Sequence, residues 1–267
     1  MRELSFEETK QVELDILVFV ADFCERHGLR YFLTYGTLIG AIRHKGFIPW
    51  DDDVDIQMPR EDYNELIRIF NAENGLGIYK AIAPTDKASR HAFVKIIDTR
   101  TVKEEPHLRY KELLGVDLDI FPIDGQPDDT AAFEAWYQSL VQIYQKYALK
   151  TVTPTYPKLK TNLNLIRKQL FIPSRQTLLK KAAKLHAQYP YETSRFVGTV
   201  ESAYNGKGNR TQKEDYDGFV TVEFEGRAFR APQGYDRILR NIYGDYMQLP
   251  PADKQVTHHE NKVYWKE

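Results

Sequence analysis

The sequence predicts an α/β fold of the α+β kind, in which a mixed sheet forms the first part and a mainly helical, basic second lobe follows. Two observations lead to this prediction. Segments with strand periodicity alternate with helical segments over the first 121 residues, and helical periodicity dominates between residues 131 and 187. With 267 residues, of which 42% are hydrophobic, the chain suits one large domain or one domain with a smaller lobe.

The first half begins with a well-marked helix. Ser5 and Glu8 match a capping box, and the apolar residues that follow keep a broadly helical spacing up to His27 and Gly28. The elements expected next are a strand at 29–33, a brief helix at 38–44, a strand at 54–58 with one apolar face, a helix at 61–70, and strands at 93–97 and 115–121, the last just before Pro122.

The second half is expected to contain helices at 131–149, 163–170 and 176–187, a polar loop at 204–210, a hairpin formed by 220–224 and 226–229, and a last helix at 235–242. We therefore divide the chain into a core at 1–130, a helical basic lobe at 131–200, and a C-terminal segment at 201–267 that packs back on the core.

Charge is unevenly distributed along the chain. Residues 146–184 contain ten Lys and Arg and no Asp or Glu, so a chain with a formal net charge of −1 carries about −11 outside this stretch. The basic residues could form a solvated helical face. They could also contact an anionic membrane surface or a phosphate-rich acceptor, and both interpretations stay open.

Cysteine usage and hydropathy indicate the compartment. Cys24 is the single cysteine, which excludes an intramolecular disulfide and a zinc site built from paired cysteines. The N-terminus has acids where a signal peptide needs an apolar run, and no segment approaches 18 apolar residues. We expect a cytoplasmic protein. The pair His258-His259 is expected to face solvent, since adjacent residues rarely point at one ion.

Two pairs of carboxylates carry the predicted chemistry. Asp53 and Asp55 would lie on one face of a strand, and Asp117 and Asp119 repeat this spacing on another strand. If these strands are neighbours, the carboxylates converge and can hold the two hard cations that phosphoryl transfer commonly uses. Asp51 and Asp52 are equally well explained as supporting residues, and Asp124 as a turn residue.

Gly36 and Thr37 precede the expected helix at 38–44. Backbone N–H groups and the threonine hydroxyl could cradle a phosphate at its N-terminus. Gly-Thr, followed after fifteen residues by Asp-Val-Asp-Ile and later by Val-Asp-Leu-Asp-Ile, is a much more specific pattern than the dipeptide alone.

At this point the chain resembles the LicD family. The resemblance is carried by residues 35–56, which run Tyr-Gly-Thr-Leu-Ile-Gly-Ala-Ile-Arg-His-Lys-Gly-Phe-Ile-Pro-Trp-Asp-Asp-Asp-Val-Asp-Ile. Residues 119–124 look like the second acidic motif of the family, and residues 232–236 and 243–246 with Pro250 look like its C-terminal motif. Residues 146–200 match nothing recognisable, so the basic lobe is left outside the resemblance.

The resemblance implies a nucleotidyltransferase-like core of the polymerase-beta type at 1–130 and a metal-dependent transfer of phosphocholine. The implied donor is CDP-choline, and the implied acceptor is a sugar hydroxyl of a lipid-linked teichoic acid or lipopolysaccharide precursor at the inner membrane face. It implies Mg²⁺, with two ions, or Mn²⁺ in its place. Relatives resembling fukutin and fukutin-related protein transfer ribitol phosphate, so another alditol phosphate or a nucleotide stays open. The sequence lacks the cysteines of the zinc-binding insertion of fukutin-related protein, and it shows no membrane anchor. Both differences favour the bacterial, cytoplasmic branch of the family.

Under this resemblance, Asp53 and Asp55 would bind the cations on the donor, while Asp119 or Asp117 would bind the second cation and help deprotonate the acceptor. One or more cationic side chains would neutralise the leaving phosphate, the candidates being Arg43, His44, Lys45 and Lys95. Each of these residues also has an explanation without a role in catalysis. Residues 43–45 could form an exposed helix end, where positive charge is favourable, and Lys95 could be a surface lysine. Choline would suit an aromatic face, and the candidates near the motifs are Trp50, Tyr31, Tyr35 and Phe121.

Two further classes of protein remain as alternatives. The chain could be a non-catalytic nucleotide-binding relative, although clustered acids without a cation would repel one another without benefit. It could also use its basic stretch to bind nucleic acid, which would show a strong salt dependence; we expect no nucleic acid partner.

Overall fold

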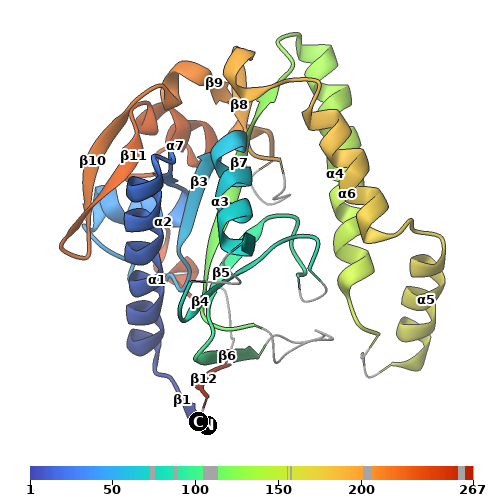
Figure 1. The fold of residues 1–267 in the computed structure, drawn as a ribbon, viewed down its shortest axis with the longest axis horizontal. Helices are drawn as coiled ribbons and strands as arrows, with labels where there is room; N and C mark the ends of the chain where they lie inside the picture. Colours follow the sequence, from blue (N-terminus) through green and yellow to red (C-terminus); the bar gives the residue numbers. More distant parts are fainter. Residues whose placement is uncertain are drawn as a thin grey trace.

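The computed structural model describes residues 1–72, 76–86, 89–104, 114–154, 156, 158–200, 206–257 and 262–266. A mixed sheet lies at the centre, three helices stand to one side of it, and the two termini meet at a small second sheet (Figure 1). The predicted residues His258 and His259, and residues 204–205 of the predicted polar loop, lie outside the described part of the chain; Gly206 onward forms a short 3-10 helix.

The strands are β1 Arg2–Glu3, β2 Phe32–Leu33, β3 Asp55–Pro59, β4 Tyr79–Ile82, β5 Val94–Asp98, β6 Thr101–Glu104, β7 Asp117–Gln126, β8 Phe196–Gly198, β9 Thr211–Gln212, β10 Phe219–Phe224, β11 Arg227–Pro232 and β12 Lys262–Trp265. The α-helices are α1 Phe6–His27, α2 Tyr35–Arg43, α3 Arg60–Ala72, α4 Thr130–Thr151, α5 Leu159–Leu170, α6 Arg175–His186 and α7 Tyr235–Tyr243. Short 3-10 helices are η2 Tyr191–Thr193, η3 Gly206–Asn209, η4 Lys213–Tyr216 and η5 Ala252–Lys254. The prediction of mixed sheet and helices is confirmed.

Local signals explain where several elements begin and end. Ser5 and Glu8 form the predicted capping box at the start of α1, and Gly28 ends the helix with a φ of 65°, which glycine adopts without strain. The predicted hairpin forms from β10 and β11, and its turn residues Glu225 and Gly226 both have positive φ.

The central sheet has the order β2-β3-β7-β5-β4, with β8 and β9 extending it from β7. β3 and β7 are parallel, and the other pairs are antiparallel. Neighbouring residues on one strand enter different hydrophobic clusters: Leu33 joins the main core with α1 and α3, while Phe32 packs with Ile238 of α7. The sheet is therefore buried on both faces. The strand predicted at 54–58 forms as β3 and includes Pro59, and all of its residues are buried, including the polar Asp55 and Gln57.

Three other expectations need correction. α2 begins at Tyr35, so Gly36 and Thr37 lie inside its first turn and not before it. β7 continues through Pro122 to Gln126, because its last residues pair with β8. Asp124 is consequently no turn residue; it is a buried strand residue whose carboxylate accepts from Arg60 Nε at 2.7 Å.

The helical lobe consists of α4, α5 and α6 and has a core of its own. α4 and α6 pack through Trp136, Tyr144 and Ala182, and the Trp136 indole donates to the Leu185 carbonyl at 3.0 Å. Arg175 connects α6 to the loop that follows β4 by donating to the carbonyls of Pro84 and Asp86 at 2.9 Å each. None of the helices in the described residues is both long enough and apolar enough to cross a membrane.

Candidate active site

The two acidic strands are neighbours, as the sequence required for a shared site. β3 and β7 run parallel with Asp55 directly opposite Asp119. Because side chains alternate along a strand and adjacent strands lie about 4.8 Å apart, the two carboxylates project side by side from one face of the sheet. Gln57 and Phe121 follow on the same face. The convergence of Asp55 and Asp119 is thus a consequence of strand register.

Asp53 reaches this site from a loop. It precedes β3, so the expected strand alternation does not position it. Its charge is nevertheless close, because the pKa of Asp55 is raised well above its usual value, first by burial and then by the charges of Asp53 and Asp119. Burial and the neighbouring Asp117 similarly raise the pKa of Asp119 to about 7, even though Lys95 opposes the shift.

Asp51 joins the same group of carboxylates. Burial and the charges of Asp53 and Asp52 raise its pKa to about 7. Its carboxylate lies against the Cα of Gly36, so closely that a Cβ added at Gly36 would collide with it. At the next residue of α2, the hydroxyl of Thr37 accepts a hydrogen bond from the backbone N–H of Asp55 at 2.8 Å. The first turn of α2 therefore positions two of the acids.

Replacing Gly36 with alanine should separate these roles. Alanine is the better helix former, so Gly36→Ala should change the melting temperature by less than about 2 °C. The new methyl group must displace the Asp51 carboxylate, and we expect a loss of activity of about 10- to 100-fold, as typically follows a small misplacement of catalytic groups. Thermal unfolding and steady-state rates measure the two effects, and unchanged activity would contradict the role of Asp51.

Lys95 is buried beneath the acids. It lies on β5 opposite Asp119, and its ammonium group donates to Asp119 at 2.6 Å and also pairs with Asp117. Lys103 Nζ pairs with the other Asp117 oxygen at 2.8 Å. Only 8% of Lys95 is exposed, so it is no surface lysine. Burial alone would raise the pKa of Asp117, but Lys103 and Lys95 lower it well below its ordinary value.

The basic residues at 43–45 lie at the opposite end of α2 from Gly36. For a helix of nine residues this is about 12 Å away. Arg43 donates to the Tyr246 carbonyl at 2.7 Å and to the His44 ring at 2.9 Å, while the Lys45 carbonyl accepts from the Glu225 N–H. The structure thus brings Lys95 to the acids and leaves Arg43, His44 and Lys45 among C-terminal contacts.

The predicted aromatic residues are divided between the core and the site. Trp50 packs partly buried against the main core. Tyr31 is buried beneath the Arg230 guanidinium. Tyr35 and Phe121 pack edge to face at a centroid distance of 5.3 Å next to the acids, and the Tyr35 hydroxyl accepts from Gln57 at 3.2 Å.

Tyr243 is a site residue that the sequence reasoning did not select. It ends α7, and although 42% of the residue is exposed, burial of its hydroxyl and the adjacent Tyr35 and Asp55 raise its pKa. The charges of Asp51 and Asp53 also act on this hydroxyl, so Tyr243 lies near the carboxylates. Its position in the Tyr-Gly-Asp-Tyr motif at 243–246 was the available signal.

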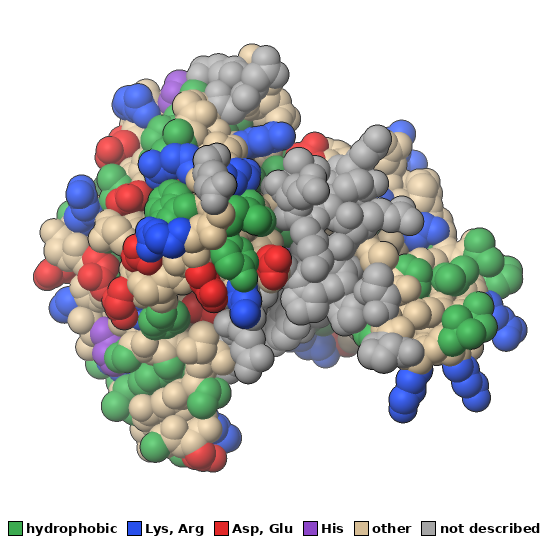
Figure 2. All heavy atoms as spheres, turned by 90° about the horizontal axis from the view of Figure 1, so that it is seen from below, with side chains coloured by type: hydrophobic (Ala, Val, Ile, Leu, Met, Phe, Trp, Pro, Cys, Tyr) green, Lys and Arg blue, Asp and Glu red, His purple; other side chains and the backbone are tan. Residues whose placement is uncertain are grey.

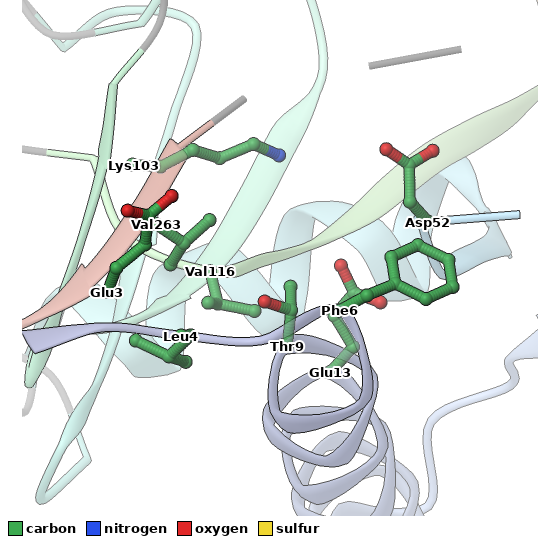
Figure 3. A pocket seen from close by; sticks show the side chains of 9 residues that line it. All are labelled: Glu3, Leu4, Phe6, Thr9, Glu13, Asp52, Lys103, Val116 and Val263. Carbon is green, nitrogen blue, oxygen red and sulfur yellow. The ribbon is translucent and has the colours of Figure 1, made fainter. Parts of the chain in front are cut away.

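Beside the acids lies an open recess of about 610 Å³, counting the space open to solvent. Figure 3 shows the Lys103 side chain extending along it and Glu13 rising from α1 below Asp52. The other residues of its lining are Glu3, Leu4, Phe6, Thr9, Val116 and Val263. Glu13 is 1% exposed, and its Oε2 has no hydrogen-bond partner among the described residues. Sequence periodicity missed Glu13, because a single acid in an apolar helical pattern gives no signal.

The Glu13 carboxyl should weaken the fold increasingly as pH rises. Burial raises its pKa well above the ordinary 4.5, ahead of an opposing effect from Lys103. An acid with a raised folded pKa loses its contribution to stability from its unfolded pKa upward. Glu13→Gln should therefore be more stable than wild type by at least about 1 kcal/mol at pH 7.5, and the difference should shrink towards pH 4.5. Denaturant unfolding in EDTA at several pH values tests this, and a destabilised variant would indicate an ionised Glu13.

The donor set suits a hard cation. Asp51, Asp53, Asp55 and Asp119 offer only carboxylate oxygens, the ligands that Mg²⁺ prefers. Burial and then mutual repulsion raise the pKa of Asp51 and Asp55, and a cation would relieve this repulsion. Within the described residues, no three Asp, Glu, His or Cys side chains already have the arrangement of a metal site. Lys95 currently supplies the positive charge at Asp119.

Comparison with known proteins identifies the family. Residues 28–159 match the model described as LicD/FKTN/FKRP, nucleotidyltransferase domain. The lipopolysaccharide cholinephosphotransferase LicD of Haemophilus influenzae is 33% identical over 271 residues, covering 99% of both chains. The chain belongs to the LicD family. The LicD assignment makes it an enzyme, a phosphotransferase, and confirms the resemblance carried by residues 35–56.

Other relatives match this chain over shorter stretches. The ribitol 5-phosphate transferase FKRP of Homo sapiens is 42% identical over 57 residues, which cover 21% of this chain and 12% of FKRP. An uncharacterized protein of Rickettsia prowazekii, RP689, is 42% identical over 52 residues.

Proposed function

We propose that this LicD-family enzyme transfers phosphocholine from CDP-choline to a sugar hydroxyl of a lipopolysaccharide or teichoic acid precursor, with Mg²⁺ as the cofactor and Mn²⁺ as a substitute. The observation that carries the proposal is the pairing of Asp55 with Asp119 on parallel strands, beside Asp51 and Asp53, in a chain similar over its whole length to a cholinephosphotransferase. We further propose that the mixed sheet is a nucleotidyltransferase-type core and that the protein works in the cytoplasm.

Asp53, Asp55 and Asp119 would hold the metal, which would neutralise charge on the donor diphosphate. Asp117 has both oxygens paired with lysines, so we assign it the role of fixing Lys95 and Lys103. An ammonium group has three donors, and the Lys95 group directs two at Asp117 and Asp119, leaving one for a donor phosphate oxygen.

The acceptor hydroxyl would attack the phosphorus that carries choline. Its proton would pass to the carboxylate of Asp119, which lies directly opposite Asp55 on the neighbouring strand. The bond between that phosphorus and the bridging oxygen would break, and cytidine monophosphate would leave with the electron pair. Tyr243, which lies near the acids, would donate a hydrogen bond to the donor.

The direct test is incubation of purified protein and MgCl₂ with CDP-choline and a lipooligosaccharide acceptor. Release of cytidine monophosphate, with a phosphocholine mass added to the acceptor, is the expected result. CDP-ribitol serves as the competing donor, because the local identity to FKRP favours ribitol phosphate as the second candidate. Product formed from CDP-ribitol alone would overturn the phosphocholine assignment.

The proposed metal site predicts a pH-dependent stability. Folding raises the pKa of Asp51 and Asp119 from 3.8 to about 7, so each carboxyl stabilises the fold at low pH and loses this effect as pH rises through 7. Between pH 6 and 8, protein in EDTA should lose up to about 1.4 kcal/mol per carboxyl. Because Mg²⁺ displaces these protons, excess MgCl₂ should restore most of the loss at pH 8. Thermal unfolding with and without EDTA measures both effects, and a melting temperature in EDTA that rises towards pH 8 would contradict the site.

A further inference from the structure

The helix α5 carries an exposed apolar stripe. Four of its apolar side chains are between 41% and 75% exposed; they are Leu159, Leu163, Ile166 and Leu170, which we call the α5 face. With 3.6 residues per turn, their spacing of four, three and four places them within roughly 60° of one another around the helix. Phe171, directly after the helix, is 83% exposed. Leu165 points to the other side of α5 and is buried.

Positive charges flank this stripe. By the same helical geometry Lys160 and Arg167 lie along one edge of the α5 face, and Lys158 directly precedes the helix as its N-cap residue. All three side chains are exposed, and residues 146–184 contain no acid that could neutralise them. A stripe of large apolar residues bordered by Lys and Arg is the pattern of a helix that lies in the interface of an anionic bilayer.

The position of α5 suits contact with a broad surface. It stands at the edge of the helical lobe, farthest from the central sheet (Figure 1), and hydrophobic and basic side chains lie together at that end of the molecule (Figure 2). The helix is fixed to α4 from behind: Lys150 donates to the Gln169 carbonyl at 2.7 Å, and the Gln169 amide donates to the carbonyls of Leu149 and Val152 at 2.9 and 2.8 Å. These hydrogen bonds hold α5 in place against the end of α4, and the α5 face remains exposed.

We propose that the α5 face docks on the surface of an anionic lipid bilayer, with its leucines among the acyl chains and Lys158, Lys160 and Arg167 at the lipid headgroups. A basic border favours an anionic surface over a second copy of the chain, whose own α5 face carries the same positive charge. This binding requires neither the phosphate donor nor the acceptor, so its test is independent of the proposed transfer reaction.

Vesicle flotation provides the test. The full chain should float with vesicles of phosphatidylcholine and phosphatidylglycerol in a 7:3 ratio (roughly the anionic fraction that gives a strong surface potential), and much less with phosphatidylcholine alone. The double variant Lys160→Gln, Arg167→Gln should bind about 30-fold more weakly, from about 1 kcal/mol per basic residue near the surface. The triple variant Leu159→Gln, Leu163→Gln, Leu170→Gln should bind at least tenfold more weakly.

The matched control is Lys180→Gln, Lys181→Gln, which removes the same charge from exposed positions on α6. It should retain most of the binding, and all variants should keep the wild-type melting temperature because the altered side chains are exposed. Equal loss in the control, or full binding by the leucine variant, would overturn the proposal. A dimer in light scattering that the leucine variant abolishes would assign the α5 face to a second copy instead.

Discussion

Asp55→Asn should reduce the turnover number at least 1,000-fold while the protein stays folded. Asp55 is buried beside Asp119 and lies at the centre of the carboxylates that would hold the metal. The amide keeps the side-chain shape but removes the charge that a cation needs, and it cannot replace a carboxylate ligand of Mg²⁺ with equal strength. Loss of one buried negative charge also relieves repulsion, so the melting temperature in EDTA should be unchanged or higher.

The control for Asp55→Asn is Asp52→Asn. Asp52 belongs to the same acidic run, but its side chain lines the recess, and we expect a loss below tenfold. Turnover of CDP-choline and calorimetric titration with Mg²⁺ are the measurements for both variants. Activity near wild type in Asp55→Asn, or equal losses in both variants, would contradict the assignment of Asp55.

Lys95→Met should destabilise the protein by about 3–5 kcal/mol, which lowers the melting temperature by roughly 10 °C. Lys95 is buried and pairs with both Asp117 and Asp119, so methionine leaves two buried carboxylates without this cation. The same change should raise the pKa of Asp119 further, because Lys95 is the group that most lowers it. The acidic limb of the pH–rate profile should therefore move to higher pH.

Lys80→Met is the matched control for this substitution. Lys80 lies on β4, next to the strand that carries Lys95, but it is exposed, and its loss should change stability by less than about 0.5 kcal/mol. Urea unfolding and pH–rate profiles separate the two effects of Lys95→Met. A variant as stable as Lys80→Met would show that the buried ion pairs contribute little, and an unmoved profile would show that Lys95 does not act on Asp119.

Much of the fold was determined by local patterns in the sequence. The capping box at Ser5, the hairpin at 220–229 and the helical periodicity of the lobe each depend on residues close in the chain, and the structure confirms them. The predicted ends of an element were less accurate where pairing with a distant strand decides its length. β7 extends past Pro122 because β8, more than 70 residues later, pairs with its end. No local pattern contains that information.

The sequence by itself determined the family and the acid-bearing strands, since the run at 35–56 and the spacing of Asp117 and Asp119 are local features. Only the tertiary structure decided how these groups act on one another. Strand register set Asp55 opposite Asp119, and contact with Gly36 brought in Asp51. Pairing of β5 with β7 made the buried Lys95 a shared counter-ion of Asp117 and Asp119. Charge interactions depend on distance and on exclusion of water, and both are fixed only when segments far apart in the chain pack together.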